Sequence, residues 1–417
     1  MTPTSNAERQ QLLPGIILGV TSGIPLLGIG LPLVAVTSAA LSPIRSSVGL
    51  PRVYWWVVWL SALALLCFFV SAALNRVAIS YSSIGQLGVF LVVLLGARSL
   101  LNRPDAIAVA LTCFGGAMVG YYLVARPANT IGSFENLWKY GIGYPVALLV
   151  VGFIVFRGLH RAFSVVALLA LAFVGAVADF RSYALICCIA AVLTVLPAAR
   201  NPRAVARRAV VVGISVVGTV VFLLSLVQRG VFGAEVAARS ASQFGDGPLG
   251  ILLGGRTEPP LAIAAIMQRP FVGWGNEQSL TQQVVSHGLA LAKSLGVHDP
   301  AAVLPLWIRA GGRVSLHSVL LTSWVEGGIA AALVFVVIIL IFVRVVLRPP
   351  SRYKALAALI AVQSIWDLLF SPWADNRGVL LGLAVLFVIA NSMKSDGGSA
   401  EPEPSVKPTT KRMREFA

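Results

Sequence analysis

The segment Ser315-Leu316-His317-Ser318 marks the point where the longest hydrophilic stretch of the chain, residues 228–315, passes into an apolar run. Nearly all of the sequence before and after that stretch is apolar enough to lie in lipid. A bilayer core offers no water to polar groups, so chemistry on a polar substrate is expected in residues 228–315 and at the helix start that follows. The other helices then hold this region in place.

Composition predicts an all-α polytopic membrane protein. Hydrophobic residues make up 57% of the 417 residues, charged residues 12%, and the mean hydropathy is +0.86. Soluble domains have about 25% charged residues. In a membrane protein, the net charge of +16 is interpreted first by the side of the membrane on which the basic residues lie. No nucleic-acid partner is expected. The cysteines lie in apolar runs without disulfide or metal-ligand spacing, which is typical of packing residues: Cys67, Cys113, Cys187 and Cys188.

Apolar runs of about 20 residues predict about twelve membrane helices. Gly23-Ile24-Pro25 interrupts the first run, residues 12–41, and indicates a short hairpin. The further spans are 53–74, 83–98, 105–125, 141–156, 162–179, 182–198, 209–227, 316–347, 353–372 and 376–394. The chain is thereby divided into N-terminal membrane helices (1–227), a loop between the ninth and tenth helices (228–315), C-terminal membrane helices (316–394) and a disordered tail (395–417).

Basic residues predict the orientation. Lys and Arg concentrate in one set of short connections, for example at Arg200, Arg203, Arg207 and Arg208, and in the C-terminal tail. By the positive-inside rule both termini are cytoplasmic and the 228–315 loop is external. No cleavable signal peptide is expected, because residues 1–11 are polar. The prediction is a multi-pass protein of the cytoplasmic (inner) membrane with its active site on the external, periplasmic side.

Two arginines on the predicted external side are candidates for binding phosphate. The sequence lacks a GxxxxGK[ST] phosphate loop, so the energy for a reaction there must already be stored in the substrate. Arg181 opens a span, and Arg256 lies in the large loop. Guanidinium groups form bidentate hydrogen bonds with phosphate oxygens, so these arginines suit a lipid-linked phosphate or diphosphate. The alternative for each is a local ion pair, Arg181 with Asp179 and Arg256 with Glu258.

His317 is the candidate general base. It lies where the loop re-enters the membrane, and an imidazole can accept the proton of a sugar hydroxyl. The alternative is a polar residue that merely caps the helix. Glu326 lies within the same predicted span and is expected to have a structural partner, because an unpaired carboxylate there is costly. The pair Gly327-Gly328 can bend the span or admit a neighbour closely.

Other loop residues have plainer interpretations. His287 and His298 are expected on the water-exposed surface. Trp274 and Trp307 either stack on sugars or lie in the interfacial belt, and the belt is the default. The acidic residues of the loop form no cluster at metal-ligand spacing, so no metal and no cofactor is predicted.

Several motifs together resemble those of the O-antigen ligase and O-antigen polymerase superfamily. The segment Arg269-Pro270-Phe271-Val272-Gly273-Trp274-Gly275 is followed by His317-Ser318-Val319-Leu320-Leu321 and by Glu326-Gly327-Gly328. Gly255-Arg256 and Asp179-Phe180-Arg181-Ser182 also match the pattern. The resemblance covers residues 175–395 in motif and the whole chain in predicted topology.

The resemblance implies a metal-independent glycosyltransferase. Such an enzyme moves a glycan from a polyprenyl diphosphate carrier to a hydroxyl of a glycan or glycolipid acceptor, with inversion. Arg181 and Arg256 would hold the diphosphate and His317 would activate the acceptor, with Arg269 and Glu326 in support. The chain departs from the family pattern at Ser318, where Asn is frequent, and at Pro259-Pro260, where a Trp is usual. Ligase and polymerase share these motifs, and the choice between them stays open.

A flippase or secondary transporter of a lipid-linked or anionic substrate is the alternative. A transporter needs polar residues deep in its spans, and the candidates are Gln363, Asp367, Ser82, Ser83 and Gln86. A scaffolding membrane protein would leave the His and Arg motifs unexplained. The gathering of basic residues on the external side favours the transferase.

Overall fold

The computed structural model describes residues 6–24, 31–41, 49–127, 130–197, 199, 201–231, 257–297, 300–309, 312–349, 353–373 and 376–397. These residues are almost entirely helical, which agrees with the predicted all-α class. The only strands among them are the short antiparallel pair β1 (Ile308–Arg309) and β2 (Arg313–Val314).

Six helical segments of the described chain are long and apolar enough to cross a membrane. They are α3 (Arg52–Asn75), α4 (Tyr81–Gly96) with the 3-10 helix η2 (Ala97–Asn102), α5 (Pro104–Ala125), the run from α6 (Phe134–Leu137) through η4 (Trp138–Ile142) to α7 (Gly143–Phe156), Pro202–Phe222 of α10 (Pro202–Gln228), and α16 (Val319–Leu347). Shorter helices complete the bundle: α1 (Asn6–Ser22), α2 (Leu31–Leu41), α8 (Arg161–Val177), α9 (Arg181–Val195), α17 (Lys354–Phe370) and α18 (Arg377–Gly397). A membrane protein is thus indicated, while the total of about twelve spans stays a prediction.

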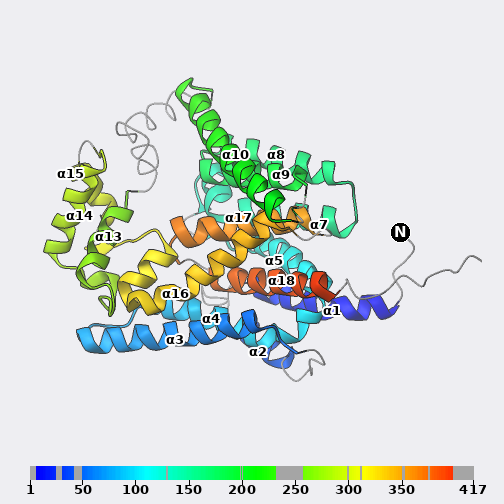
Figure 1. Ribbon diagram of the computed structural model, residues 1–417, viewed down its shortest axis with the longest axis horizontal. Helices are drawn as coiled ribbons and strands as arrows, with labels where there is room; N and C mark the ends of the chain where they lie inside the picture. The colour runs from blue at the N-terminus through cyan, green and yellow to red at the C-terminus, as the bar shows by residue number, and fades with distance from the viewer. Residues whose placement is uncertain are drawn as a thin grey trace, which may run out of the picture.

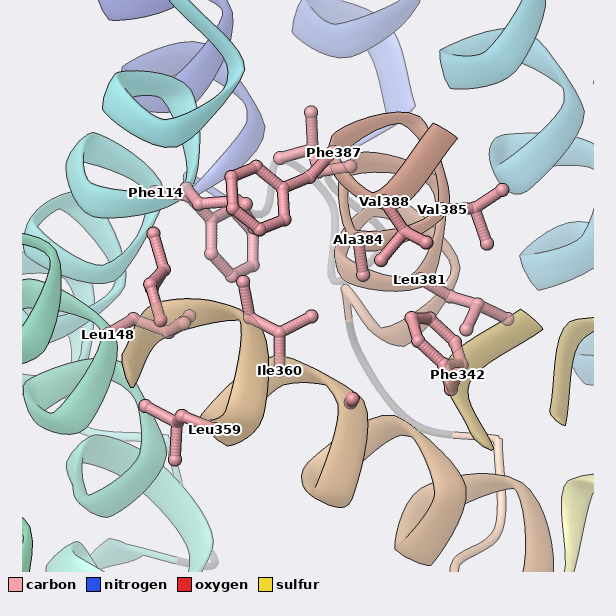
Figure 2. Packing of buried hydrophobic residues seen from close by; sticks show 14 of the residues in the cluster. Phe114, Leu148, Phe342, Leu359, Ile360, Leu381, Ala384, Val385, Phe387 and Val388 are labelled. Atoms are coloured by element: carbon pink, nitrogen blue, oxygen red, sulfur yellow. The ribbon is translucent and has the colours of Figure 1, made fainter. Parts of the chain in front are cut away.

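The bundle core lies where α5, α7, α16, α17 and α18 meet. Side chains from each of these helices interlock there, among them Phe114, Leu148, Phe342, Leu359 and Phe387 (Figure 2). Lipid is as apolar as these side chains, so close packing rather than removal from water holds such a core together.

α10 lies on the outside of the bundle (Figure 1). Only 6% of its apolar window is buried, and Val210, Ile214 and Val217 are exposed, as expected for a helix that faces lipid. Arg208 ties the start of α10 to its neighbours, because its guanidinium donates to the carbonyl oxygens of Leu196 (3.1 Å), Pro197 (2.5 Å) and Val346 (2.8 Å).

The α13–α15 region forms a small second core at one end of the bundle (Figure 1). It comprises α13 (Pro259–Gln268), the 3-10 turn η5 (Glu277–Ser279), α14 (Gln282–Ser294), α15 (Pro300–Trp307) and the β1–β2 hairpin. Trp274 and Trp307 lie inside this core, only 5% and 0% exposed. Their indole N–H groups donate to the carbonyl oxygens of Ala265 and Thr257. The expectation of sugar-stacking or belt tryptophans is therefore wrong for both.

A break in α16 joins this region to the bundle. Gly328 has φ of 74°, and the loop Pro270–Gly275 lies along the break. The N–H groups of Trp274 and Gly275 donate to the carbonyl oxygens of Val325 (2.7 Å) and Glu326 (2.9 Å). A Cβ on Gly328 would lie 1.9 Å from the Phe271 oxygen. The glycine pair bends the helix and admits a close neighbour, as predicted, and it brings two of the sequence motifs together.

Candidate functional site

The start of α16 presents His317. Ser318 is the N-cap residue: its hydroxyl accepts from the N–H of Leu321 (3.1 Å) and lies 3.2 Å from the carbonyl oxygen of Leu368 on α17. Capping therefore belongs to Ser318, and the interpretation of His317 as a cap is wrong. The imidazole is left for other contacts.

His317 faces Glu258, the residue that precedes α13. Its Nδ1 lies 2.7 Å from Oε1 of Glu258, and the two side chains are only 17% and 11% exposed. The contact is close but bent, so it is an electrostatic pairing rather than a well-aligned hydrogen bond. Water is mostly excluded there, which strengthens the attraction between a carboxylate and any positive charge on the ring.

The opposite ring nitrogen of His317 meets Arg309 at the end of β1. Nη2 of Arg309 lies 3.3 Å from Nε2 of His317. An arginine can only donate, so Nε2 is the acceptor and the proton of a neutral ring lies on Nδ1, beside Glu258. Such an arrangement is chemically able to act as a general base, because the lone pair on Nε2 can accept a proton and the carboxylate beside Nδ1 would stabilise the resulting imidazolium.

The backbone before His317 is fastened to η5. The side-chain amide of Gln278 accepts from the N–H of Val314 (2.8 Å) and donates to its carbonyl oxygen (2.9 Å). Oε2 of Glu277 accepts from the N–H of Leu316 (3.3 Å). On the other side of the segment, the N–H of Ser315 donates to the carbonyl oxygen of Trp307 (2.9 Å). Residues 314–316 are thus hydrogen-bonded on both sides, which fixes the position of the backbone that carries the His317 imidazole.

Two carboxyl groups lie beneath this segment. Glu326 is completely buried, and its Oε1 accepts from the N–H of Glu277 (3.3 Å). The prediction that Glu326 has a structural partner is confirmed. Burial, and then the nearby charge of Glu326, raises the pKa of Glu277 to about 8, although the Leu316 N–H and Arg309 act in the opposite direction.

The structure describes one of the two arginines that were predicted to bind phosphate. Arg181 begins α9, and its Nε lies 3.1 Å from Oδ1 of Asp179, so the local ion pair that was the alternative is present. Arg256 lies outside the described residues. The convergence of Arg181 and Arg256 on one anion stays a prediction.

Arg269 has a structural environment. Its guanidinium lies 4.1 Å from the centre of the Trp274 ring and donates to Oδ1 of Asn75, at the end of α3. Nδ2 of Asn75 in turn donates to the carbonyl oxygen of Gly273 (3.2 Å). Arg269 thus holds the Pro270–Gly275 loop against α3.

Four residues of this site were not predicted from the sequence: Glu258, Glu277, Gln278 and Arg309. For Arg309 a local signal exists, because Arg309-Ala310-Gly311-Gly312-Arg313 has the glycines that a tight hairpin requires. The other three act through partners that lie 36 or more residues away, and no local pattern marks them.

The remaining candidates lie elsewhere. His287 is exposed, as expected, with its Nδ1 3.1 Å from Nε2 of Gln268, and His298 lies outside the described residues. Asp367 of α17 pairs with Arg377 (3.4 Å) and accepts from Gln363 (3.0 Å). Among the described residues no three His, Cys, Asp or Glu side chains gather as metal ligands would.

The wider comparisons add no relative to this geometry. No family model, curated protein or solved structure matches the chain.

Proposed function

We propose that this protein is a membrane glycosyltransferase that moves a glycan from a polyprenyl diphosphate carrier to a hydroxyl group of a glycan or glycolipid acceptor. The observation that carries the proposal is the contact of His317 with Glu258, 2.7 Å apart, at the start of a membrane-length helix. A carboxylate-backed histidine at that depth suits a reaction between a lipid-anchored donor and a water-side acceptor. The motif resemblance to O-antigen ligases and polymerases points to the same chemistry.

The proposed topology has about twelve spans, with both termini in the cytoplasm and the 228–315 loop on the external face of the cytoplasmic membrane. Its support is the distribution of Lys and Arg along the sequence. On this topology the α13–α15 region and His317 face the external side, where lipid-linked glycans are joined to acceptors.

In the proposed reaction Nε2 of His317 takes the proton of the acceptor hydroxyl. The hydroxyl oxygen attacks the anomeric carbon from the face opposite the carrier, and a new glycosidic bond forms with inversion. The bond from that carbon to the diphosphate oxygen breaks, and its electron pair leaves with the polyprenyl diphosphate. Glu258 stabilises the imidazolium that results.

The leaving diphosphate gains negative charge as its bond to the sugar breaks. Arg181 and Arg256 are the proposed donors that stabilise this charge, without a metal ion. The loss of one such donor costs about 3 kcal/mol of barrier, or a hundredfold or more in rate.

The transporter alternative has weaker support. Its deep polar candidates, Asp367 and Gln363, already bond to each other, and Asp367 also pairs with Arg377. The ion pair joins α17 to α18, and the Gln363 bond lies within α17, so both contacts have a structural explanation. A direct assay of bond formation separates the two functions.

The test uses purified protein in detergent micelles. Carrier-linked glycan and acceptor are extracted from cells that lack the protein, and the release of polyprenyl diphosphate is measured together with the glycosylated acceptor. The wild-type protein is expected to form product, and His317→Gln is expected to reduce turnover by about 10²–10⁴. His287→Gln, an exposed histidine on α14, is the matched control and is expected to retain wild-type turnover.

Absence of product from wild-type protein, combined with protein-dependent movement of the carrier-linked glycan across vesicle membranes, would establish the transporter instead. Equal turnover of the His317→Gln and wild-type proteins would show that another group is the base.

A further inference from the structure

In this structure Arg309 already contacts Nε2 of His317, the nitrogen atom that must accept the proton in the proposed reaction. Nε2 of His317 carries the lone pair, and Nη2 of Arg309 lies 3.3 Å from it. An acceptor hydroxyl cannot give its proton to Nε2 while the guanidinium donates there. Some event must therefore separate Arg309 from His317 before the ring can work.

The β1–β2 hairpin places a second arginine beside the first. Arg309 and Arg313 are directly opposite in the antiparallel register, so their side chains leave the same face of the hairpin. Both residues are exposed, while their neighbours Ile308 and Val314 point inward. Like charges directly opposite each other repel, and an anion between them relieves that repulsion.

Neither arginine forms an ion pair with a residue in the part of the chain that the structure describes. The carboxyl group that faces Arg309 is Glu277, which acts on it through space and whose own hydrogen bonds go to Leu316 and Gln278. Among the described residues, no carboxylate lies close enough to these two guanidinium groups to form an ion pair.

We propose that Arg309 caps Nε2 of His317 in the substrate-free protein, and that a phosphate-type anion bound between Arg309 and Arg313 draws the guanidinium away and frees the base. The inference rests on the proposed function, since it concerns the activation of the same histidine. The anion is a phosphate or diphosphate group, supplied either by the donor lipid or by a phosphorylated acceptor.

Arg309 is expected to bind a phosphate more strongly than it binds the imidazole of His317. An arginine binds phosphate through two parallel, charge-assisted hydrogen bonds, which are about twice as strong as neutral ones. Its contact with the imidazole is a single long hydrogen bond of 3.3 Å. A bound phosphate therefore outcompetes the ring for Arg309. The base is then free only when a substrate anion is in place, which prevents idle proton transfer to water.

The experiment measures the reactivity of His317 directly, without an activity assay. The chain has four histidines, so His160→Gln, His287→Gln and His298→Gln together leave His317 as the single one. In this background the rate of His317 acylation by diethyl pyrocarbonate is followed by mass spectrometry, with and without inorganic pyrophosphate. Size-exclusion profile and thermal midpoint establish that each variant is folded.

Pyrophosphate is expected to accelerate acylation by about fivefold, the factor that corresponds to the loss of one ordinary hydrogen bond to the ring. Arg309→Ala is expected to show the faster rate from the start and no response to pyrophosphate. Arg313→Ala is expected to keep the slow basal rate and to need more pyrophosphate. Arg229→Ala, an exposed arginine at the end of α10, is the matched control and is expected to behave like wild type.

A rate that is unchanged in Arg309→Ala would overturn the cap, and Arg309→Lys serves as a second test if the alanine variant does not fold. A wild-type rate that pyrophosphate leaves unchanged or slows would overturn the anion trigger. Pyrophosphate that merely shields the ring would slow acylation in Arg309→Ala as well. A short-chain polyprenyl diphosphate and a sugar phosphate, compared in the same assay, distinguish donor from acceptor as the source. None of these outcomes depends on transferase turnover, so failure here and failure of the proposed function are separable.

Discussion

The side-chain amide of Gln278 pairs with both backbone groups of Val314, at 2.8 and 2.9 Å, as a neighbouring strand would. Val314 lies three residues before His317. The amide therefore sets the height and direction at which the chain enters the site, and with Glu277 it supplies the partners that the 314–316 segment would otherwise seek in water.

Gln278→Ala is expected to reduce turnover by about ten- to a hundredfold, because a displacement of about 1 Å in a reacting group can cost that much. Donor binding should be retained, since the amide positions the proposed base and not the arginines proposed to bind the diphosphate. The change in unfolding free energy should stay near 1 kcal/mol, because Gln278 is exposed and water can replace the amide. Steady-state kinetics on the detergent-purified protein measures the split between kcat and KM.

Gln282→Ala is the matched control, because this exposed glutamine lies at the start of α14, four residues after Gln278 in the sequence. Equal kinetics for the two alanine variants would contradict the positioning role of Gln278.

Glu258→Gln is expected to lower turnover by about a hundredfold, within the range that a general base contributes. The amide keeps the size of the side chain but removes the negative charge that, in the proposed mechanism, stabilises the imidazolium of His317. The variant protein should show this loss in kcat. Glu135→Gln, an exposed carboxylate at α6, controls for the loss of one charge. If Glu258→Gln turned over like wild type, Glu258 would have no part in the base.

Stability should fall as the pH is raised through the titration of Glu277. Its pKa in the folded protein is about 8, against 4.5 for the unperturbed group, so the folded state keeps a proton that the unfolded state releases in this window. The stability contributed by the neutral carboxyl is complete below about pH 4.5 and is lost as the pH rises through about 8.

Glu277→Gln removes the titrating group, so its thermal midpoint should fall less than that of wild type between about pH 4 and about pH 9, which bracket the window of about 4.5 to 8. Thermal unfolding in detergent at a series of pH values measures the difference. Parallel curves for the two proteins would mean that Glu277 titrates near its ordinary pKa.

Gly328→Ala is expected to destabilise the junction between α16 and the α13–α15 region. Backbone of this kind, with φ of 74° and ψ of −176°, costs a residue with a Cβ about 1–3 kcal/mol. The new Cβ would also lie 1.9 Å from the Phe271 oxygen, so the Pro270–Gly275 loop must move. The yield of folded protein and its thermal midpoint in detergent should both drop.

Gly85→Ala provides the comparison for Gly328. A Cβ at Gly85 meets nothing within 4 Å, and the residue is inside α4, so alanine there should leave stability unchanged or raise it by about 0.5–1 kcal/mol. Similar midpoints for the two variants would show that the break in α16 tolerates a side chain.

The sequence alone determined the features that follow from local patterns. Long apolar runs predicted helices of membrane length, and six are present among the described residues. Gly327-Gly328 predicted a bend or a close approach in α16, and both occur. The sequence also predicted correctly that His317 lies at the start of a helix, because the change from polar to apolar residues is visible in the chain itself.

The tertiary structure decided which groups meet His317. Glu258, Arg309 and Gln278 reach the site, or the segment before it, from three separate parts of the α13–α15 region. It also buried Trp274 and Trp307, which hydropathy alone would place at the membrane interface. Hydropathy and helical periodicity report only on neighbours a few residues apart. Contacts across 36 or more residues depend on how the α13–α15 region packs onto α16. That packing is fixed where the Pro270–Gly275 loop lies against the break at Gly328.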